Sequence, residues 1–150
     1  MTVTMRDPET TSRIMASVRS RDTAPELALR RALHKRGIRY RVRTTDVLGH
    51  PDLTIKKYRL AVFIDGDMWH GHEHVRRGLP DLESLFPSRT EFWCEKIRRN
   101  IARDREVNEG LRAAGWTVVR IWASDVEADP EAAARAVMKA LDSAKVAGKQ

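Results

Sequence analysis

The stretch Leu60-Ala61-Val62-Phe63-Ile64-Asp65-Gly66-Asp67-Met68-Trp69-His70 (residues 60–70) indicates where the central strand of this chain lies. Its first half is an apolar run, which is typical of a buried strand. Asp65 ends the run, and His70 follows it five residues later. Upstream, Gly49-His50-Pro51-Asp52-Leu53 places Asp52 at the start of another predicted strand. A turn at Lys56-Lys57 would pair the two strands and bring both carboxylates to one edge of a sheet.

Two carboxylates and a histidine at one sheet edge are suited to phosphodiester cleavage. Carboxylate oxygens bind a hard divalent cation such as Mg²⁺, and an imidazole can transfer protons near neutral pH. For either aspartate alone, ordinary turn chemistry explains the sequence as well. Taken together, Asp52, Asp65 and His70 predict a metal-dependent nuclease site.

Two further acids are candidates for the same site. Asp104 shares the apolar stripe of a predicted helix over residues 89–114, so it faces inward and needs a partner. It either pairs with an arginine or orients His70 or a water on the metal. Glu26 shares a stripe with Leu29, but the order Thr23-Ala24-Pro25-Glu26 is also typical of a capped helix start. Capping and catalysis both remain open for Glu26.

The loop after the central strand carries three histidines and an apolar pair. His70, His72 and His74 alternate as they would on a strand, and this spacing alone is weak evidence for zinc. Met68 and Trp69 either anchor the loop on the core or insert between DNA bases.

Composition bounds the class of protein. A chain of 150 residues with 41% hydrophobic residues predicts one domain, over residues 11–145, between a flexible arm at 1–10 and a tail at 146–150. The single cysteine, Cys94, excludes an intramolecular disulfide. No apolar run approaches the ~20 residues of a membrane span, and the N-terminus lacks a signal-peptide core. We therefore expect a monomer in the cytoplasm, associated with the nucleoid and not with a membrane.

The charge balance predicts a nucleic-acid partner. There are 28 Lys+Arg and 21 Asp+Glu, which makes a net charge of +7, and 21 of the basic residues are arginine. The arginine fork matches phosphate geometry and stays charged. Genomic base composition is the alternative explanation for the arginine excess, although it explains the net charge less well.

The order of predicted elements indicates an α/β fold. Helices are expected at 11–19, from Thr23 to Arg36, at 89–114 before Gly115, and from Asp129-Pro130 to Ala144. Strands are expected at 38–43, 52–55, 59–64 and 116–122, with a long functional loop over 66–88. This order, ααβββαβα, describes a small mixed β-sheet flanked by helices.

Several short motifs occur in a characteristic order along the chain. They are Thr11-Ser12-Arg13 with Met15, Arg21 to Glu26, Gly49 to Asp52, Phe63 to His72, Arg89 to Trp93, Lys96-Ile97, Asn100 with Arg103-Asp104, Gly115-Trp116 and Ile121-Trp122. From about Thr11 to Val126 this pattern resembles the very short patch repair (Vsr) endonucleases. The resemblance implies a restriction-endonuclease-like fold of the PD-(D/E)xK type and Mg²⁺-dependent nicking of one DNA strand beside a T:G mismatch.

The resemblance also implies roles for individual residues. Asp52, His70 and Asp104 match the catalytic residues of the family, and Glu26 matches an acid in its N-terminal helix. The family inserts apolar side chains at the mismatch. The matching positions are Met15, Met68 and Trp69.

The chain departs from the family pattern at its metal sites. Asp65 stands where the family usually has histidine, and would strengthen a carboxylate Mg²⁺ site. Ile64 replaces a threonine, so its contribution to the metal would be its backbone carbonyl. The positions that match the family's structural zinc site are Asp67, His72, His74 and Ser124. Only His72 is kept, so a zinc ion would need an oxygen and nitrogen site made by Asp67, His72, His74 and Asp125. Without zinc, we expect residues 78–87 to supply the packing.

These observations favour a Mg²⁺-dependent enzyme that nicks double-stranded DNA at a T:G mismatch. The departures keep a second reading open, a Vsr-type endonuclease of different specificity that serves restriction or phage defence. A third reading is a DNA-binding domain without catalysis, against which the intact acids and His70 argue.

Overall fold

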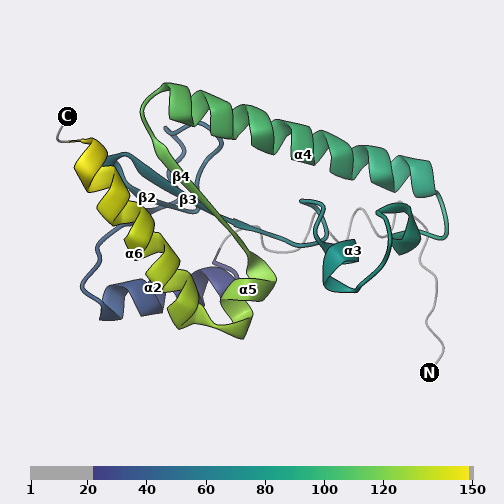
Figure 1. The fold of residues 1–150 in the computed structure, drawn as a ribbon, viewed down its shortest axis with the longest axis horizontal. Coiled ribbons are helices and arrows are strands. Elements are labelled where there is room, and N and C mark those ends of the chain that lie inside the picture. The colour runs from purple at the N-terminus through teal and green to yellow at the C-terminus, as the bar shows by residue number, and fades with distance from the viewer. Residues whose placement is uncertain (1–21, 149–150) are drawn as a thin grey trace.

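A four-stranded sheet forms the centre of the computed structural model, which describes residues 22–148 (Figure 1). Its strands are β1 (Arg41–Val42), β2 (Leu53–Ile55), β3 (Leu60–Asp65) and β4 (Thr117–Trp122), in that spatial order. The pairs β1–β2 and β2–β3 are antiparallel, whereas β3 and β4 are parallel. The predicted mixed α/β fold is therefore confirmed. The expected helix at 11–19, the arm at 1–10 and Met15 lie outside the described residues.

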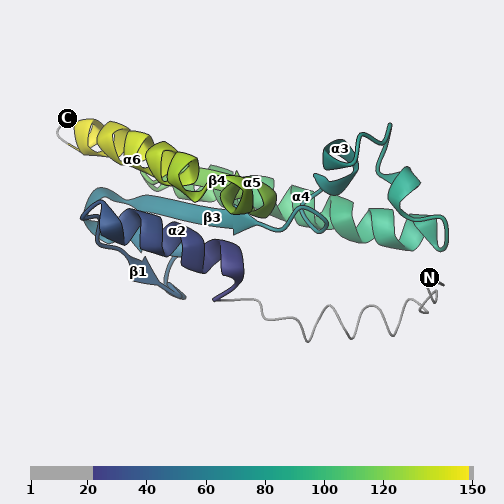
Figure 2. The ribbon, with the colours of Figure 1, turned by 90° about the horizontal axis from the view of Figure 1, so that it is seen from below.

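Helices cover both faces of this sheet (Figure 1). The helices α2 (Ala24–Lys35), α5 (Ala123–Ala128) and α6 (Pro130–Ala147) lie on one side, and α4 (Thr90–Ala113) lies on the other. Both α2 and α6 run along β3 (Figure 2). Because side chains alternate along a strand, Leu60 and Val62 pack toward α2 and α6, whereas Ala61 and Phe63 pack toward α4.

The N-terminal end of α4 extends past the sheet and carries a second hydrophobic cluster (Figure 1). There α3 (Glu73–Arg76) and the 3₁₀ turn η2 (Glu83–Leu85) lie in the segment before α4. Leu82, Cys94 and Ile97 form a buried cluster at this end, with Leu85 and Phe86 packed against it. Part of the segment at 78–87 thus packs on α4, as expected.

Several boundaries and caps differ from the predictions. The strand predicted at 38–43 is limited to Arg41–Val42, and the Lys56-Lys57 turn is the 3₁₀ helix η1 (Lys56–Tyr58). The segment 66–88 is not a continuous loop, because it contains α3 and η2, and α5 was not predicted. The side chain of Thr23 makes no cap hydrogen bond.

Within residues 22–148, no helix is both long enough and apolar enough to cross a membrane.

Other helix limits follow their sequence signals. The Asp129 side chain accepts a hydrogen bond from the Ala132 amide at 3.1 Å, and Pro130 is the first residue of α6. This helix continues to Ala147, past its predicted end at Ala144. At the end of α4, Gly115 has a φ of +86°, a left-handed conformation that glycine adopts without strain.

Candidate active site

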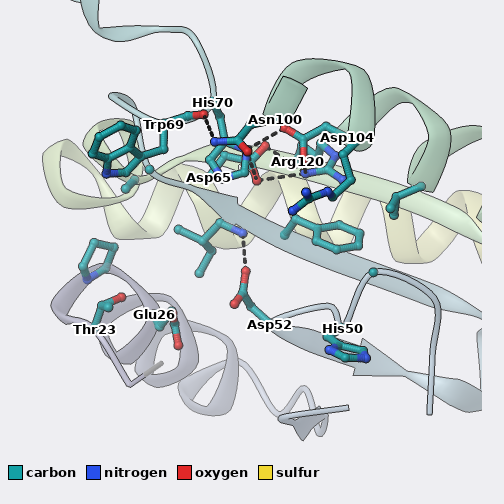
Figure 3. Close-up of a pocket in the computed structure, with 18 residues that line it drawn as sticks. Thr23, Glu26, His50, Asp52, Asp65, Trp69, His70, Asn100, Asp104 and Arg120 are labelled. Carbon is teal, nitrogen blue, oxygen red and sulfur yellow. Dashed lines mark hydrogen bonds and ion pairs between the residues drawn. The ribbon is translucent and has the colours of Figure 1, made fainter. Parts of the chain in front are cut away.

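A cleft of about 640 Å³ opens where the parallel strands β3 and β4 end. Its walls come from the start of α2, the loop before β2, the end of β3 with the following loop, α4 and β4. Asp52, Asp65, His70, Asp104 and Glu26 all line it. The catalytic residues predicted from the sequence therefore face one cleft. They lie in two groups, on opposite sides of β3 (Figure 3).

Asp52 and Glu26 form the first group, on the side of β3 toward α2 (Figure 3). The Ile64 amide donates to Asp52 Oδ2 at 2.7 Å, which ties the loop before β2 to the end of β3. Within residues 22–148, the Asp52 carboxylate makes no ion pair. Burial raises the pKa of this carboxyl from 3.8 to about 6, and the negative charges of Glu26 and Asp65 add to the rise.

Glu26 is buried, with 5% of its surface exposed, and its charge is already partnered. Its Oε2 accepts from the Asp22 amide at 2.8 Å and from Arg30 Nη2 at 3.2 Å. Arg30 also pairs with the Asp22 carboxylate at 2.7 Å. The carboxylate of Glu26 thus satisfies a backbone amide before α2, as a helix cap does, while its residue lines the cleft.

Asp65, His70 and Asp104 form the second group, on the side of β3 toward α4 (Figure 3). One potential ligand atom from each residue lies within 4.8 Å of the other two. Asp52 is not part of this set. Asp65 is 7% exposed, and burial raises the pKa of its carboxyl, against the opposing effects of His70 and Arg120. The pairing of β2 with β3 therefore brings both acids to one cleft but gives them different partners.

His70 is held from two directions. Its Nδ1 forms a hydrogen bond of 2.5 Å with Asp104 Oδ2 and lies 3.8 Å from Asp65 Oδ1. Its backbone amide donates to the Gly66 carbonyl at 3.2 Å. With Nδ1 engaged by a carboxylate, Nε2 is the ring nitrogen left to exchange a proton. Asp104 thus has the partner that its place on the inward stripe required.

Arg120 and Asn100 are site residues that the sequence reasoning did not assign. Arg120 Nη1 donates to both oxygens of Asp65, at 2.9 and 3.1 Å, and lies 3.5 Å from Asp104 Oδ1. Asn100 Nδ2 donates to the Trp69 carbonyl at 3.0 Å and so ties the loop to α4. Arg120 did leave a signal, because it is the one charge within the otherwise apolar run from Val118 to Trp122. A charge in such a strand needs a buried partner.

Trp69 packs on the core and also lines the cleft. Its ring centroid is 5.8 Å from that of Trp93, and Lys96 Nζ lies over both rings, at 5.3 and 5.7 Å. The anchoring role considered from the sequence is therefore present in the structure. Trp69 and Met68 are both partly exposed, so each side chain is accessible to a ligand.

The four residues considered for zinc are not gathered into one cluster. His72 Nδ1 lies 2.8 Å from Asp67 Oδ2, and Ser124 donates to Asp67 through Oγ at 2.6 Å and through its amide at 3.0 Å. His74 Nδ1 is buried without a hydrogen-bond partner in the described chain, and Asp125 is exposed on α5. The alternation expected for the three histidines is wrong, because His72 precedes α3 and His74 lies within it.

Hydrogen bonds hold the Asp67 region together. Burial alone would raise the pKa of Asp67, but its hydrogen bonds with Ser124 and His72 hold that pKa below its usual value. The His72 ring also stacks on Trp122, with centroids 4.3 Å apart and planes 7° apart. These contacts connect the loop after β3 to the end of β4 and the start of α5.

Comparison with known proteins identifies relatives of this chain. The family model described as DNA mismatch endonuclease Vsr matches residues 3–76. Type II nicking enzyme V.NmeDIP of Neisseria meningitidis serogroup C is 40% identical over 134 residues, which is 89% of this chain and 87% of that enzyme. DNA mismatch endonuclease Vsr of Escherichia coli K12 is 36% identical over 118 residues, 79% of this chain and 72% of its own. Type II nicking enzyme V.NaeI of Lentzea aerocolonigenes is 42% identical over 129 residues, 81% and 72% of the two chains.

Proposed function

The chain belongs to the Vsr family and is a DNA endonuclease, and on this basis we propose that it nicks one strand of double-stranded DNA at a T:G mismatch with Mg²⁺ as its cofactor. The observation that carries the proposal is the shared cleft, which contains Asp52, a carboxylate with no ion-pair partner among residues 22–148, and a carboxylate-held imidazole, His70. We assign the sheet and its flanking helices to the restriction-endonuclease-like fold of the PD-(D/E)xK type. Pro51-Asp52 would be the Pro-Asp pair of that motif.

The surroundings of Asp52 fit a Mg²⁺ ion. Its Oδ2 accepts a hydrogen bond from the Ile64 amide. Among residues 22–148, no group bonds to its Oδ1 and no basic side chain pairs with it. Mg²⁺ prefers hard oxygen ligands and usually binds one or two carboxylates while keeping several waters. Asp52 and the backbone carbonyl of Ile64 would hold the ion. When bound, Mg²⁺ would polarise the phosphoryl oxygens and stabilise the charge that develops on them.

The remaining residues act on protons and on orientation. His70 would exchange a proton with the attacking water or the leaving group through Nε2. Asp104 holds Nδ1 and thereby sets the ring orientation and tautomer. Asp65, the other acid proposed for the metal from the sequence, has both oxygens engaged by Arg120 and is not assigned to the Mg²⁺ ion here.

A basic stripe on α4 offers a path for the DNA backbone. Lys96, Arg99 and Arg103 are spaced by three and four residues, so they lie on one flank of the helix. Arg103 lines the cleft, and Lys96 lies over the ring of Trp69, which also lines it. Their charges suit phosphates on either side of the cleaved bond, a sequence-independent attraction that falls with salt.

The assignment to mismatched DNA concerns Trp69 and Met68, with Met15 as a third candidate. Trp69 lines the same cleft and carries an apolar surface that could enter a base step. Unstacking a step costs a few kcal/mol, and costs least where the bases are mispaired. An apolar insertion would therefore select a mismatch by its lower opening cost.

A different specificity is the second candidate function. Relatives such as V.NmeDIP and V.NaeI are named Type II nicking enzymes, a name that states DNA nicking without stating mismatch repair. Such a role requires nicking in a defined sequence context and does not change the chemistry at Asp52 and His70.

A cleavage assay separates these functions. Matched and T:G-containing duplexes, each labelled on one strand, are incubated with the protein in Mg²⁺ or in EDTA. Mismatch repair predicts Mg²⁺-dependent nicking of one strand of the T:G duplex only. Equal nicking of both duplexes would support a different specificity. Binding without any nicking, in Mg²⁺ or Mn²⁺, would reject the catalytic assignment.

A further inference from the structure

A guanidinium group already occupies the cluster of Asp65, His70 and Asp104. This cluster is the set of three potential ligand residues that converge within 4.8 Å in residues 22–148. Arg120 Nη1 lies 2.9 and 3.1 Å from the two oxygens of Asp65 and 3.5 Å from Asp104 Oδ1. The position between the two carboxylates, which a divalent cation would need, is therefore held by a permanent positive charge.

Arg120 is fixed in this position by further contacts. It lies in the parallel ladder of β3 and β4, directly opposite Phe63, and its guanidinium carbon is 4.1 Å from the centroid of the Phe63 ring. Its Nε donates to Asn108 Oδ1 on α4 at 2.7 Å. The side chain is only 18% exposed. Moving the guanidinium aside would break an ion pair, a hydrogen bond and a cation–π contact together.

The two groups of the cleft differ in which carboxylates are paired with an arginine. In the second group, two carboxylates are opposed by Arg120, so a divalent ion there would meet a like charge at close range in a poorly solvated site. In the first group, the charge of Glu26 is opposed by Arg30, but Asp52 has no ion-pair partner in the described chain. A metal ion therefore gains more from Asp52 than from the Asp65 cluster.

We infer that Arg120 is the resident cation of the Asp65–Asp104 pair, so this cluster takes no divalent metal and the enzyme binds its metal ion at Asp52 and the Ile64 carbonyl. Arg120 is thus a positioning residue, which holds Asp104 and, through it, His70. Only the ion at Asp52 rests on the proposed function. The exclusion of metal from the second group rests on the position of Arg120 itself.

Counting bound Mn²⁺ tests this inference without measuring activity. Equilibrium binding to the metal-free protein, followed by the electron paramagnetic resonance signal of free Mn²⁺, gives the number of ions bound per chain. We expect one ion for the parent and none for Asp52→Asn, in which Arg120 is intact. We expect one ion for the double variant Asp52→Asn/Arg120→Met, which opens the second group. Adding Asp65→Asn to that double variant should remove this ion.

Two results would overturn the inference. The first is a bound Mn²⁺ in Asp52→Asn, because the second group would then hold a metal beside Arg120; this measurement needs no change at Arg120 and so does not depend on the folding of that variant. The second is a folded Asp52→Asn/Arg120→Met protein, verified by circular dichroism, that binds no ion. Failure of the proposed function looks different: the parent itself binds no Mn²⁺, while the gain on removing Arg120 can still be read.

Discussion

Replacing Asp52 with asparagine is expected to stabilise the metal-free protein at neutral pH while it abolishes nicking. Burial raises the pKa of Asp52 from 3.8 to about 6, so the charged form is disfavoured in the folded state. A rise of this size corresponds to a cost of about 3 kcal/mol when the carboxyl is ionised in both the folded and the unfolded states. Asparagine carries no charge, and its side-chain oxygen can still accept from the Ile64 amide.

The difference in free energy of unfolding between Asp52→Asn and the parent should depend on pH. The proton on Asp52 favours the folded state, and this contribution is complete below a pH of about 4 and is lost as the pH rises through about 6. The free energy of unfolding of Asp52→Asn should therefore exceed that of the parent by less than about 1 kcal/mol at pH 4. At pH 7.5 in EDTA it should exceed that of the parent by about 2 to 3 kcal/mol, which corresponds to roughly 5–10 °C in melting temperature.

Urea unfolding of both proteins at the two pH values measures the difference. Excess Mg²⁺ at pH 7.5 should narrow it, because a ligand that binds the folded parent adds RT ln(1 + [L]/Kd) to its stability and adds nothing where Asp52 is absent. A gain in stability of the same size at pH 4 and pH 7.5, or no gain at either, would refute the reasoning that Asp52 carries an uncompensated charge. Full nicking activity in Asp52→Asn would refute its role as metal ligand.

Three further variants test the site and the DNA path. His70→Ala should slow single-turnover nicking by at least about 100-fold because it removes the proton-transfer group; His74→Ala is the control, and equal slowing in both would reject the assignment to His70. Trp69→Ala should weaken binding to T:G DNA more than to matched DNA in fluorescence titrations, whereas a fall in thermal stability with unchanged discrimination would leave Trp69 as an anchor only. Arg99→Ala should reduce the slope of log K against log salt by about 1, while Arg105→Ala, on the opposite flank of α4, should leave it unchanged; equal slopes for both variants would place the DNA elsewhere.

Local signals predicted much of the framework. The apolar run before Asp65 forms β3, Asp129-Pro130 starts α6, and Gly115 follows the end of α4. Each of these depends on neighbours in sequence, through side-chain burial, a side-chain cap or the left-handed conformation of glycine. The helix α5 was missed because it has only six residues, Ala123–Ala128, too few to establish a helical period.

Only some of the site residues and their partners could be predicted from the local sequence. The sequence by itself determined that acids and a histidine stand at the ends of neighbouring strands, since a buried apolar run followed by a carboxylate indicates a sheet edge. It could not determine which carboxylate would be free. The parallel pairing of β3 with β4 places Arg120 opposite Phe63, where its guanidinium reaches Asp65. Among the residues that the structure describes, it leaves Asp52 with the Ile64 amide as its one hydrogen-bond partner. That difference arises from contacts between residues more than fifty positions apart, 65 and 120, which only the tertiary structure brings together.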